Sequence, residues 1–166
     1  MKERCAPRVH SMNPAAPAHP TPPRNVTGMP DQKMTQLARK MRGLDLCLMT
    51  TVTSDGHLAS RPMSNNGEVE YDGTSYFFTW ADSRTAKDIG KNKHVQLNFR
   101  AEKEFLFVAV QGDATLTTDR DAMQEHWQEQ LTQWFKEGLD TPGLTMIEVK
   151  ARRVNWWGEE DGEIEL

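Results

Sequence analysis

Residues 74–92 read TSYFFTWADSRTAKDIGKN, and this stretch joins a predicted strand to a predicted helix. Its aromatic and β-branched first part is typical of a strand, and a short polar turn follows. The helix is expected to begin after Ser83, whose hydroxyl can cap it. The first turn of a helix leaves N–H groups unpaired and carries a partial positive charge, so it favours an anion. Arg84 and Lys87 add cations there and sharpen the preference toward a phosphate dianion.

The segment before this stretch contains the second group of candidate site residues. Residues 57–64 include Arg61-Pro62-Met63 and follow a β-branched run at 46–53. The polar turn Ser54-Asp55-Gly56 separates the two runs, which predicts a β-hairpin. Arg61 taken alone is typical of a solvated or salt-bridged strand residue, and 83–87 taken alone is typical of an ordinary capped helix.

Alternation of apolar and polar residues predicts the rest of the fold. Further strands are expected at 68–71, 74–79, 95–100, 104–118 and 145–154, with Gly112 as a bulge or bend. Three helices are expected, and the second of them in the chain spans 84–92. The first begins after Asp31 and has on one face Met34, Leu37, Met41 and Leu44. The third begins at Arg120 and has on one face Met123, Trp127, Leu131 and Trp134. Six or so antiparallel strands with few helices predict a mainly β fold, a small closed or partly closed barrel rather than a doubly wound sheet.

The composition limits the architecture and excludes several classes of function. The chain has 166 residues, 37% of them hydrophobic, which is enough for one domain with a single core. Its formal net charge of −4 argues against non-specific nucleic-acid binding, which needs a dominant basic field. Cys5 and Cys47 are the only cysteines, so no disulfide framework is expected. No apolar run approaches the ~20 residues that span a bilayer.

Three regions are expected along the chain. Residues 1–30 are rich in Pro, Ala, Asn and His and are predicted to be a disordered extension that lacks the apolar centre of a secretory signal. Residues 31–158 form the predicted barrel domain, and residues 159–166 form an acidic, solvated end. We therefore expect a cytoplasmic protein without a membrane or nucleic-acid partner. The five histidines show no metal-ligand spacing, so no metal site is expected.

The order of several short motifs resembles the pyridoxamine 5′-phosphate oxidase-like proteins, which are FMN-binding split barrels. The motifs are Arg61-Pro62-Met63, Phe77-Phe78-Thr79, Ser83-Arg84 with Lys87, and Val108-Ala109-Val110-Gln111-Gly112. Within that family, the bacterial general stress protein branch is the most similar, on Asp119-Arg120, His126-Trp127, the segment 134–140 and Trp156-Trp157. The resemblance covers roughly Asp31 to Gly158.

The resemblance implies a six-stranded antiparallel split barrel of the Greek-key type and a homodimer with two flavin sites at the subunit interface. FMN is the implied cofactor, with FAD as the other flavin to consider. Arg61, Pro62 and Met63 would lie beside the isoalloxazine, and Phe78 and Thr79 alongside the ring and ribityl chain. Ser83, Arg84, Thr85 and Lys87 would surround the phosphate. Trp156 or, preferably, Trp157 would close the pocket.

Two departures from the family pattern affect the expected activity. Relatives often carry Lys two residues after the serine that corresponds to Ser83, where this chain has Thr85. The positive charge that holds the phosphate would therefore come from Arg84 and Lys87. The basic and hydroxyl residues that hold the substrate phosphate of true pyridoxamine phosphate oxidases are not recognisable after Trp157, so vitamin B6 oxidation is not expected.

Three functions stay open on the sequence. The first is an FMN-dependent oxidoreductase of the general stress type with an unidentified small-molecule redox substrate. The second is a non-catalytic flavin-binding protein that carries or senses the cofactor. The third is a dimeric interaction module without a cofactor. The stripe of Met123, Trp127, Leu131 and Trp134 is expected to be helix packing, and the adjacent Trp156 and Trp157 are expected to point to opposite faces of a strand.

Overall fold

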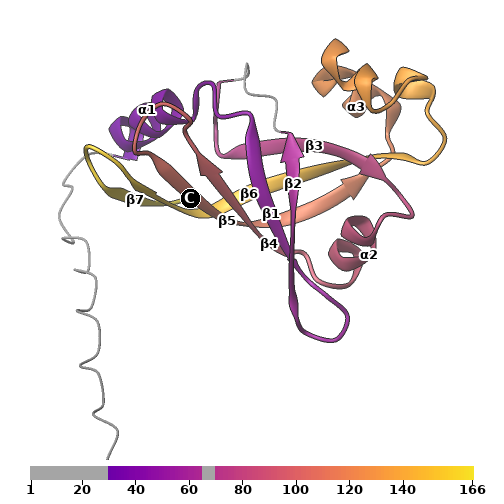
Figure 1. Cartoon of the computed structure of the whole chain (residues 1–166), viewed down its shortest axis with the longest axis horizontal. Helices are drawn as coiled ribbons and strands as arrows, with labels where there is room; N and C mark the ends of the chain where they lie inside the picture. Colours follow the sequence, from indigo (N-terminus) through magenta and orange to yellow (C-terminus); the bar gives the residue numbers. More distant parts are fainter. Residues whose placement is uncertain (1–29, 65–69) are drawn as a thin grey trace, which may run out of the picture.

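A computed structural model describes residues 30–64 and 70–166, and its described part is mainly antiparallel β-sheet with three α-helices (Figure 1). The strands are β1 (Leu46–Val52), β2 (Leu58–Ser64), β3 (Thr74–Trp80), β4 (His94–Arg100), β5 (Phe107–Thr117), β6 (Leu144–Trp157) and β7 (Gly162–Glu165). The α-helices are α1 (Pro30–Met41), α2 (Arg84–Lys91) and α3 (Arg120–His126), and two short 3-10 helices, η1 (Glu129–Gln133) and η2 (Gly138–Asp140), follow α3. The predicted mainly β class is confirmed.

One sheet carries all the described strands, in the order β2-β1-β4-β5-β6-β3, with β7 pairing to β6 beyond that path. Every pairing is antiparallel. β2 and β3 have no pairing with each other among the described residues, so the sheet is not closed. These two strands are therefore the ends of the path and border the split in the barrel, and β7 is a further edge strand beside β6.

The irregularity predicted at Gly112 is confirmed, but the extra residue lies in the partner strand. Gln111 of β5 pairs with Arg153 of β6 and Gly112 pairs with Ala151, so Arg152 has no partner in β5. A Cβ at Gly112 would lie 2.5 Å from the carbonyl oxygen of Lys150, so only glycine fits this close approach of two strands. The bend that results lets two long strands curve around the core.

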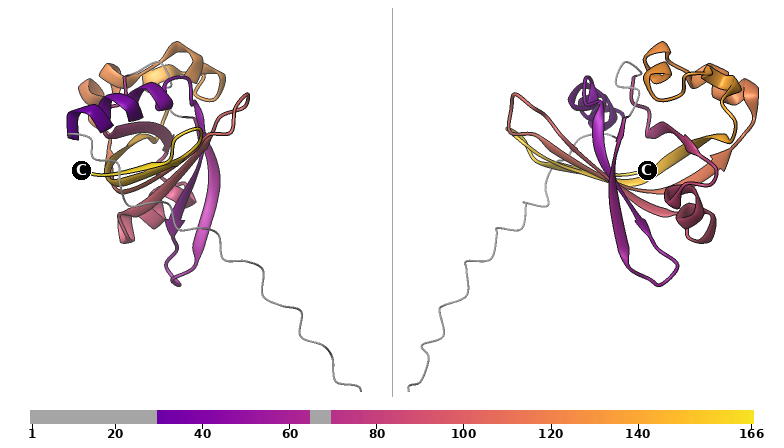
Figure 2. Two further views of the ribbon diagram at one scale, coloured as in Figure 1. Left: turned by 90° about the vertical axis from the view of Figure 1, so that its left-hand side faces the viewer. Right: turned by 45° about the vertical axis from the view of Figure 1, so that its right-hand side comes forward.

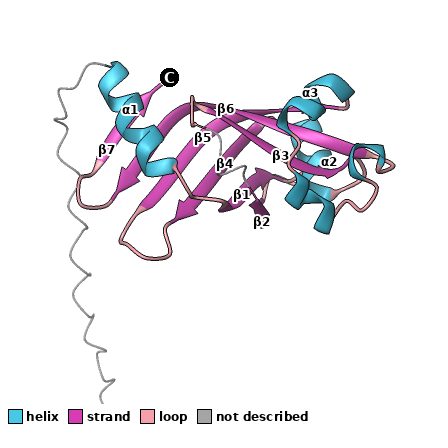
Figure 3. Cartoon of the chain, turned by 90° about the horizontal axis from the view of Figure 1, so that it is seen from above, coloured by secondary structure: helices cyan, strands magenta, loops and turns pink. Residues whose placement is uncertain are grey.

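The main core lies inside the curved sheet and is closed at its ends by helices. Strand residues alternate between this core and the outer face, as in Val95, Leu97 and Phe99 of β4, which are all buried. α1 lies at one end of the molecule, near β7, and buries Leu37 and Met41 (Figures 1 and 3). α2 contacts β1, β3 and β5 at the other end.

A second, smaller core covers the outer face of β3 and β6. Its buried residues are Phe78, Met123, Leu131, Phe135, Leu144 and Met146. The covering residues come from α3 and the two 3-10 helices, which lie above the sheet end in both views of Figure 2. The predicted single helix from Arg120 is wrong, because the helix ends at His126 and Trp127 has an extended backbone. Met123 and Leu131 are buried as expected, but Trp134 is 50% exposed.

Three other sequence expectations change. The first helix begins at Pro30 rather than after Asp31, and Leu44 lies beyond its end although it is buried. The predicted hairpin of 68–71 with 74–79 is wrong in the part that the structure describes, because Glu70 and Tyr71 lie outside any strand. Residues 68–69 are outside the described residues. The second predicted strand forms β3, which pairs with β6. The acidic end 159–166 contains β7, which pairs with β6 and packs near α1.

Candidate functional site

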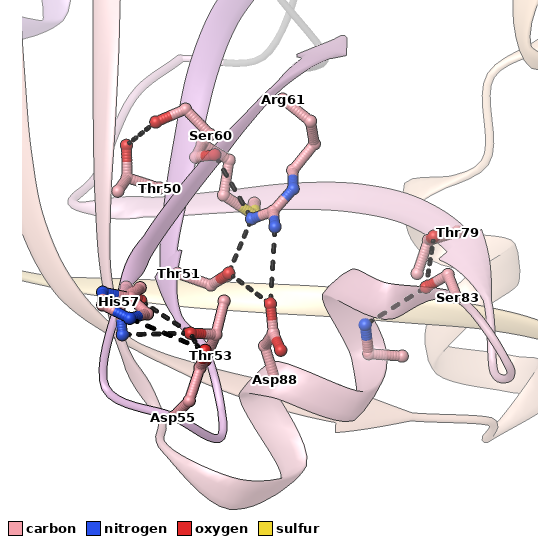
Figure 4. Close-up of polar contacts among 12 residues, drawn as sticks. Thr50, Thr51, Thr53, Asp55, His57, Ser60, Arg61, Thr79, Ser83 and Asp88 are labelled. Atoms are coloured by element: carbon pink, nitrogen blue, oxygen red, sulfur yellow. Dashed lines mark hydrogen bonds and ion pairs between the residues drawn. The ribbon is translucent and has the colours of Figure 1, made fainter.

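The candidate site lies where α2 begins beneath the two strands that border the split in the barrel. Arg61 comes from edge strand β2, Thr79 from edge strand β3, and Ser83 caps α2 (Figure 4). The structure thus brings together residues from the two sequence segments that carry the motifs. α2 links them, because it contacts both β1, the partner of β2, and β3.

Ser83 caps α2 as the sequence predicts, and its hydrogen bonds show what it can still do. Its Oγ accepts a bond from the N–H of Ala86 at 3.1 Å and one from the hydroxyl of Thr79 at 3.1 Å. A serine hydroxyl also donates one proton, which these two bonds leave available. The N–H groups of Arg84 and Thr85 are in the first turn and have no carbonyl one turn earlier to bond. The end of the helix therefore offers three donors to an anion.

The charged residues of α2 are divided between its two faces. Arg84 and Lys87 are exposed, whereas Thr85, Ala86, Asp88 and Ile89 form the buried face. Among the described residues, neither Arg84 nor Lys87 forms an ion pair within 4.0 Å. The two cations are available to a phosphate, while Thr85 can reach one through its backbone N–H rather than its buried side chain.

Arg61 points into the barrel and belongs to a buried polar network. Its guanidinium donates to Thr51 Oγ1 at 2.7 Å and to the Met49 carbonyl oxygen at 3.4 Å, and it forms an ion pair with Asp88 at 3.4 Å. The Thr51 hydroxyl donates in turn to the same carboxylate oxygen of Asp88 at 2.8 Å. The side chains of Arg61 and Asp88 are 19% and 8% exposed. A surface salt bridge, the simplest expectation for Arg61 alone, is therefore replaced by a buried one.

The electrostatics of this network connect Arg61 to the start of α2. Burial lowers the pKa of the Arg61 guanidinium, the Asp88 carboxylate opposes that shift, and the charge of Arg84 adds to it. Arg61 and Arg84 therefore act on each other as like charges across the site. Asp88 and Thr51 were missed by the sequence analysis. The signal for Asp88 was its place at helical spacing with Thr85 and Ile89, on the side of α2 that becomes its buried face.

The other predicted residues of β2 and β3 divide between the faces of the sheet. Met63 points inward with Arg61 and packs against the main core, while Pro62 is exposed on the outer face. Thr79 is buried on the inner face of β3. The side chain of Phe78 instead lies in the second core, edge-on to Trp127 with ring centroids 5.2 Å apart. Phe78 therefore offers backbone atoms, not its ring, to a ligand on the inner side.

Trp157 lies far from the start of α2 within one chain. Leu144, at one end of the 14-residue strand β6, pairs with Trp80 beside the cap, and Trp157 is at the other end of β6. At about 3.3 Å per residue this separation is roughly 40 Å along the strand. Trp157 is 38% exposed on the outer face and Trp156 is buried, which confirms that the two point to opposite faces.

A second polar cluster lies on the outer face of β5, around Asp113. Its carboxylate is 2.9 Å from His94 Nδ1, 3.1 Å from Lys93 Nζ and 2.8 Å from Arg152 Nε. Desolvation alone would raise the pKa of Asp113, but hydrogen bonds from Lys93, His94 and Arg152 outweigh it and lower the pKa to about 2. In residues 30–64 and 70–166, no three His, Cys, Asp or Glu side chains are placed to hold a metal ion. No helix in these ranges is long and apolar enough to cross a membrane.

Solved structures of other proteins share this fold. A protein from Clostridium acetobutylicum related to general stress protein 26 superposes with a TM-score of 0.71 at 14% identity, over 83% of this chain and 97% of that one. General stress protein 26 from Bacillus anthracis gives 0.69 at 18% identity, over 81% and 99%. A general stress FMN/FAD binding protein from Xanthomonas citri gives 0.66 at 20% identity, over 82% and 95%.

Sequence comparison identifies the family. The protein bli-3 of Neurospora crassa is 29% identical over an alignment of 133 residues, which covers 72% of this chain and 62% of that protein. This chain therefore spans less than two thirds of the length of that relative. The family model described as pyridoxamine 5′-phosphate oxidase like matches residues 32–166, which include every described strand and the start of α2. The chain belongs to the pyridoxamine 5′-phosphate oxidase-like family.

Proposed function

We propose that the protein binds FMN at the split between β2 and β3, with the phosphate at the start of α2. The observation that carries this proposal is the set of donors at that helix end. The Ser83 hydroxyl, the N–H groups of Arg84 and Thr85 and the exposed side chain of Arg84 converge where a phosphate dianion is favoured. The family and the FMN/FAD binding neighbour from Xanthomonas citri support a flavin as the ligand that carries this phosphate.

The residues present fit such a group without the lysine that Thr85 replaces. Arg84 and Lys87 are exposed at neighbouring positions of α2 and have no ion-pair partner among the described residues, so both charges are available. Arg61 lies on the inner side of β2, where it would stabilise negative charge on the ring of a flavin. Thr79 would contact the ribityl chain, and Met63 and the backbone of Phe78 would line the ring.

We propose further that two copies of the chain complete each site. Trp157 is roughly 40 Å along β6 from the start of α2, so a pocket that contains both takes them from different chains. The outer face of the sheet supports such a contact, because it exposes several large apolar side chains. These are Leu46 at 61%, Leu48 at 50%, Phe107 at 39% and Trp157 at 38% exposure. A homodimer that buries this outer face would bring Trp157 of one copy to the site of the other.

The activity that this site supports best is electron transfer between FMN and a small-molecule substrate. A bound flavin supplies the redox chemistry, and the protein holds it, adjusts its charge and excludes water. The second candidate is flavin binding without turnover. The ion pair of Arg61 with Asp88 favours this alternative, since the positive charge of Arg61 is already paired with a buried carboxylate and is less able to stabilise a reduced flavin. Vitamin B6 oxidation is not proposed, because the C-terminal residues form β7 on β6 rather than a basic phosphate site.

Equilibrium dialysis of the full chain with FMN, FAD and riboflavin tests the binding proposal. We expect saturable binding of FMN at micromolar concentration and weaker binding of riboflavin, which lacks the phosphate. No binding of FMN would leave the cofactor-free interaction module as the remaining function. Anaerobic addition of a reduced nicotinamide then separates the two flavin candidates: an oxidoreductase bleaches its bound flavin faster than free flavin is bleached, and a carrier does not.

A further inference from the structure

The buried network around Asp88 joins the two halves of the candidate site. Asp88 Oδ2 accepts from the Thr51 hydroxyl at 2.8 Å and lies 3.4 Å from the Arg61 guanidinium, which itself donates to Thr51 at 2.7 Å (Figure 4). The three residues come from α2, β1 and β2. The network therefore ties the edge strand β2 to the helix whose first turn would hold the phosphate.

The position of Asp88 on α2 sets its distance from that phosphate. Ser83 caps the helix and Asp88 comes five residues later, so at 1.5 Å per residue the two lie roughly 7.5 Å apart along the axis. Arg61 contacts α2 at the level of Asp88, one to two turns from the cap. A ligand that has its phosphate at Ser83 and extends toward β2 would bring its ring near Arg61 and Asp88.

Asp88 supplies the negative charge that offsets the positive charges near Arg61. Arg61, Arg84 and the positive end of the α2 dipole all favour negative charge in the site. Asp88 is the carboxylate in ion-pair contact with Arg61 in the described part of the chain, and its side chain is only 8% exposed, so solvent screens it weakly. An acidic side chain buried beside an anion site works against binding unless its charge is matched to a nearby cation.

We infer that Asp88 is a positioning residue that, with Thr51, holds the Arg61 guanidinium at the flavin ring and offsets its charge, and so sets the reduction potential of the bound flavin. This inference rests on the proposed FMN site. Flavin that takes up two electrons and one proton gains one negative charge. Removing the carboxylate at Asp88 should therefore stabilise reduced FMN relative to oxidised FMN, and removing the cation at Arg61 should do the reverse.

The test is the potential of bound FMN, measured by anaerobic reductive titration against a reference dye. Asp88→Asn should raise the ratio of affinities for reduced and oxidised FMN about tenfold, an upward shift of ~30 mV for a two-electron couple. Arg61→Gln should lower that ratio by about the same factor. The double variant should return to within about threefold of the wild type, because it removes both charges. Thr51→Val keeps both charges and should shift the ratio less than either single variant.

Asp113→Asn is the matched control, since it also removes a partly buried, ion-paired carboxylate but belongs to a separate cluster with Lys93 and Arg152. It should leave the potential unchanged. If Asp88→Asn does not fold, as judged by circular dichroism, Arg61→Gln and the double variant still decide the question. Equal potentials in Arg61→Gln, the double variant and the wild type would overturn the inference while FMN binding by the wild type stands. Failure of the wild type to bind FMN would instead overturn the proposed function.

Discussion

Replacing Arg84 by alanine tests whether the proposed phosphate site lies at the start of α2, apart from the rest of the proposed flavin site. Arg84 is the first residue of α2, is exposed and has no ion-pair partner among the described residues, so its removal leaves no buried charge and no cavity. A hydrogen bond to a charged group contributes about 1.5–3 kcal/mol. The loss of one such bond to the FMN phosphate predicts an affinity for FMN about 10- to 150-fold weaker. Riboflavin, which lacks the phosphate, should lose less than about threefold.

Isothermal titration calorimetry or fluorescence quenching with both ligands measures this difference. Arg120→Ala is the matched control, because Arg120 is also the first residue of a capped helix, α3, but is paired with Asp140 instead. It should leave both affinities unchanged. The wild-type preference for FMN over riboflavin should also shrink at 1 M salt, where the Debye length is only about 3 Å. Equal losses for FMN and riboflavin in Arg84→Ala would refute the placement of the phosphate at α2.

Three further predictions concern stability and assembly. Gly112→Ala should lower the free energy of unfolding by about 1–3 kcal/mol or more in urea denaturation, because its Cβ would lie 2.5 Å from a backbone carbonyl; an unchanged midpoint would contradict the tight approach of β5 and β6. Asp113 has a folded-state pKa lowered to about 2, so its contribution to stability is present above its ordinary value of 3.8 and is lost as the pH falls toward 2. The difference in melting temperature between wild type and Asp113→Asn should therefore shrink as the pH falls from 3.8 toward 2. Leu48→Glu should convert a dimer to a monomer in light scattering, with FMN binding weakened in the same variant; a dimer that persists would exclude this face as the interface.

Much of the fold follows from local sequence pattern, and the failures have physical causes. The β1–β2 hairpin, the alternation in β4 and the cap of α2 each depend on residues within one turn or strand, and each was predicted. The second hairpin is wrong in its described part, where Tyr71 lies outside any strand and its aromatic ring packs in the main core at 7% exposure. The prediction of one long helix after Arg120 is wrong because apolar residues at helical spacing continue beyond the end of α3. Leu131 belongs to that pattern but packs against Phe78 of β3 from a 3-10 helix.

The site was predictable in its residue types but not in how those residues are used. A period-two pattern places Arg61 and Met63 on one face of β2, yet it cannot say that this face meets α2. Asp88 and Thr51 are 37 residues apart in sequence and are brought together only by the packing of α2 on β1. Two residues that come into contact from different helices or strands produce no hydrophobic periodicity in either segment, so the sequence pattern does not reveal the contact.

The structural role of Arg61 and the role proposed for it at a flavin constrain each other. A buried arginine needs a carboxylate to offset the cost of desolvation, and breaking such a pair from one side typically costs about 3–5 kcal/mol. The same carboxylate, however, reduces the field that Arg61 exerts on a flavin. Thr51 reconciles the two demands, since its hydroxyl accepts from Arg61 and donates to Asp88 and so orients both groups through one atom. The exposed cations, Arg84 and Lys87, then provide the attraction for phosphate that the neutralised Arg61 does not. On this view, binding strength depends on the exposed face of α2, and the redox properties of the flavin depend on its buried face.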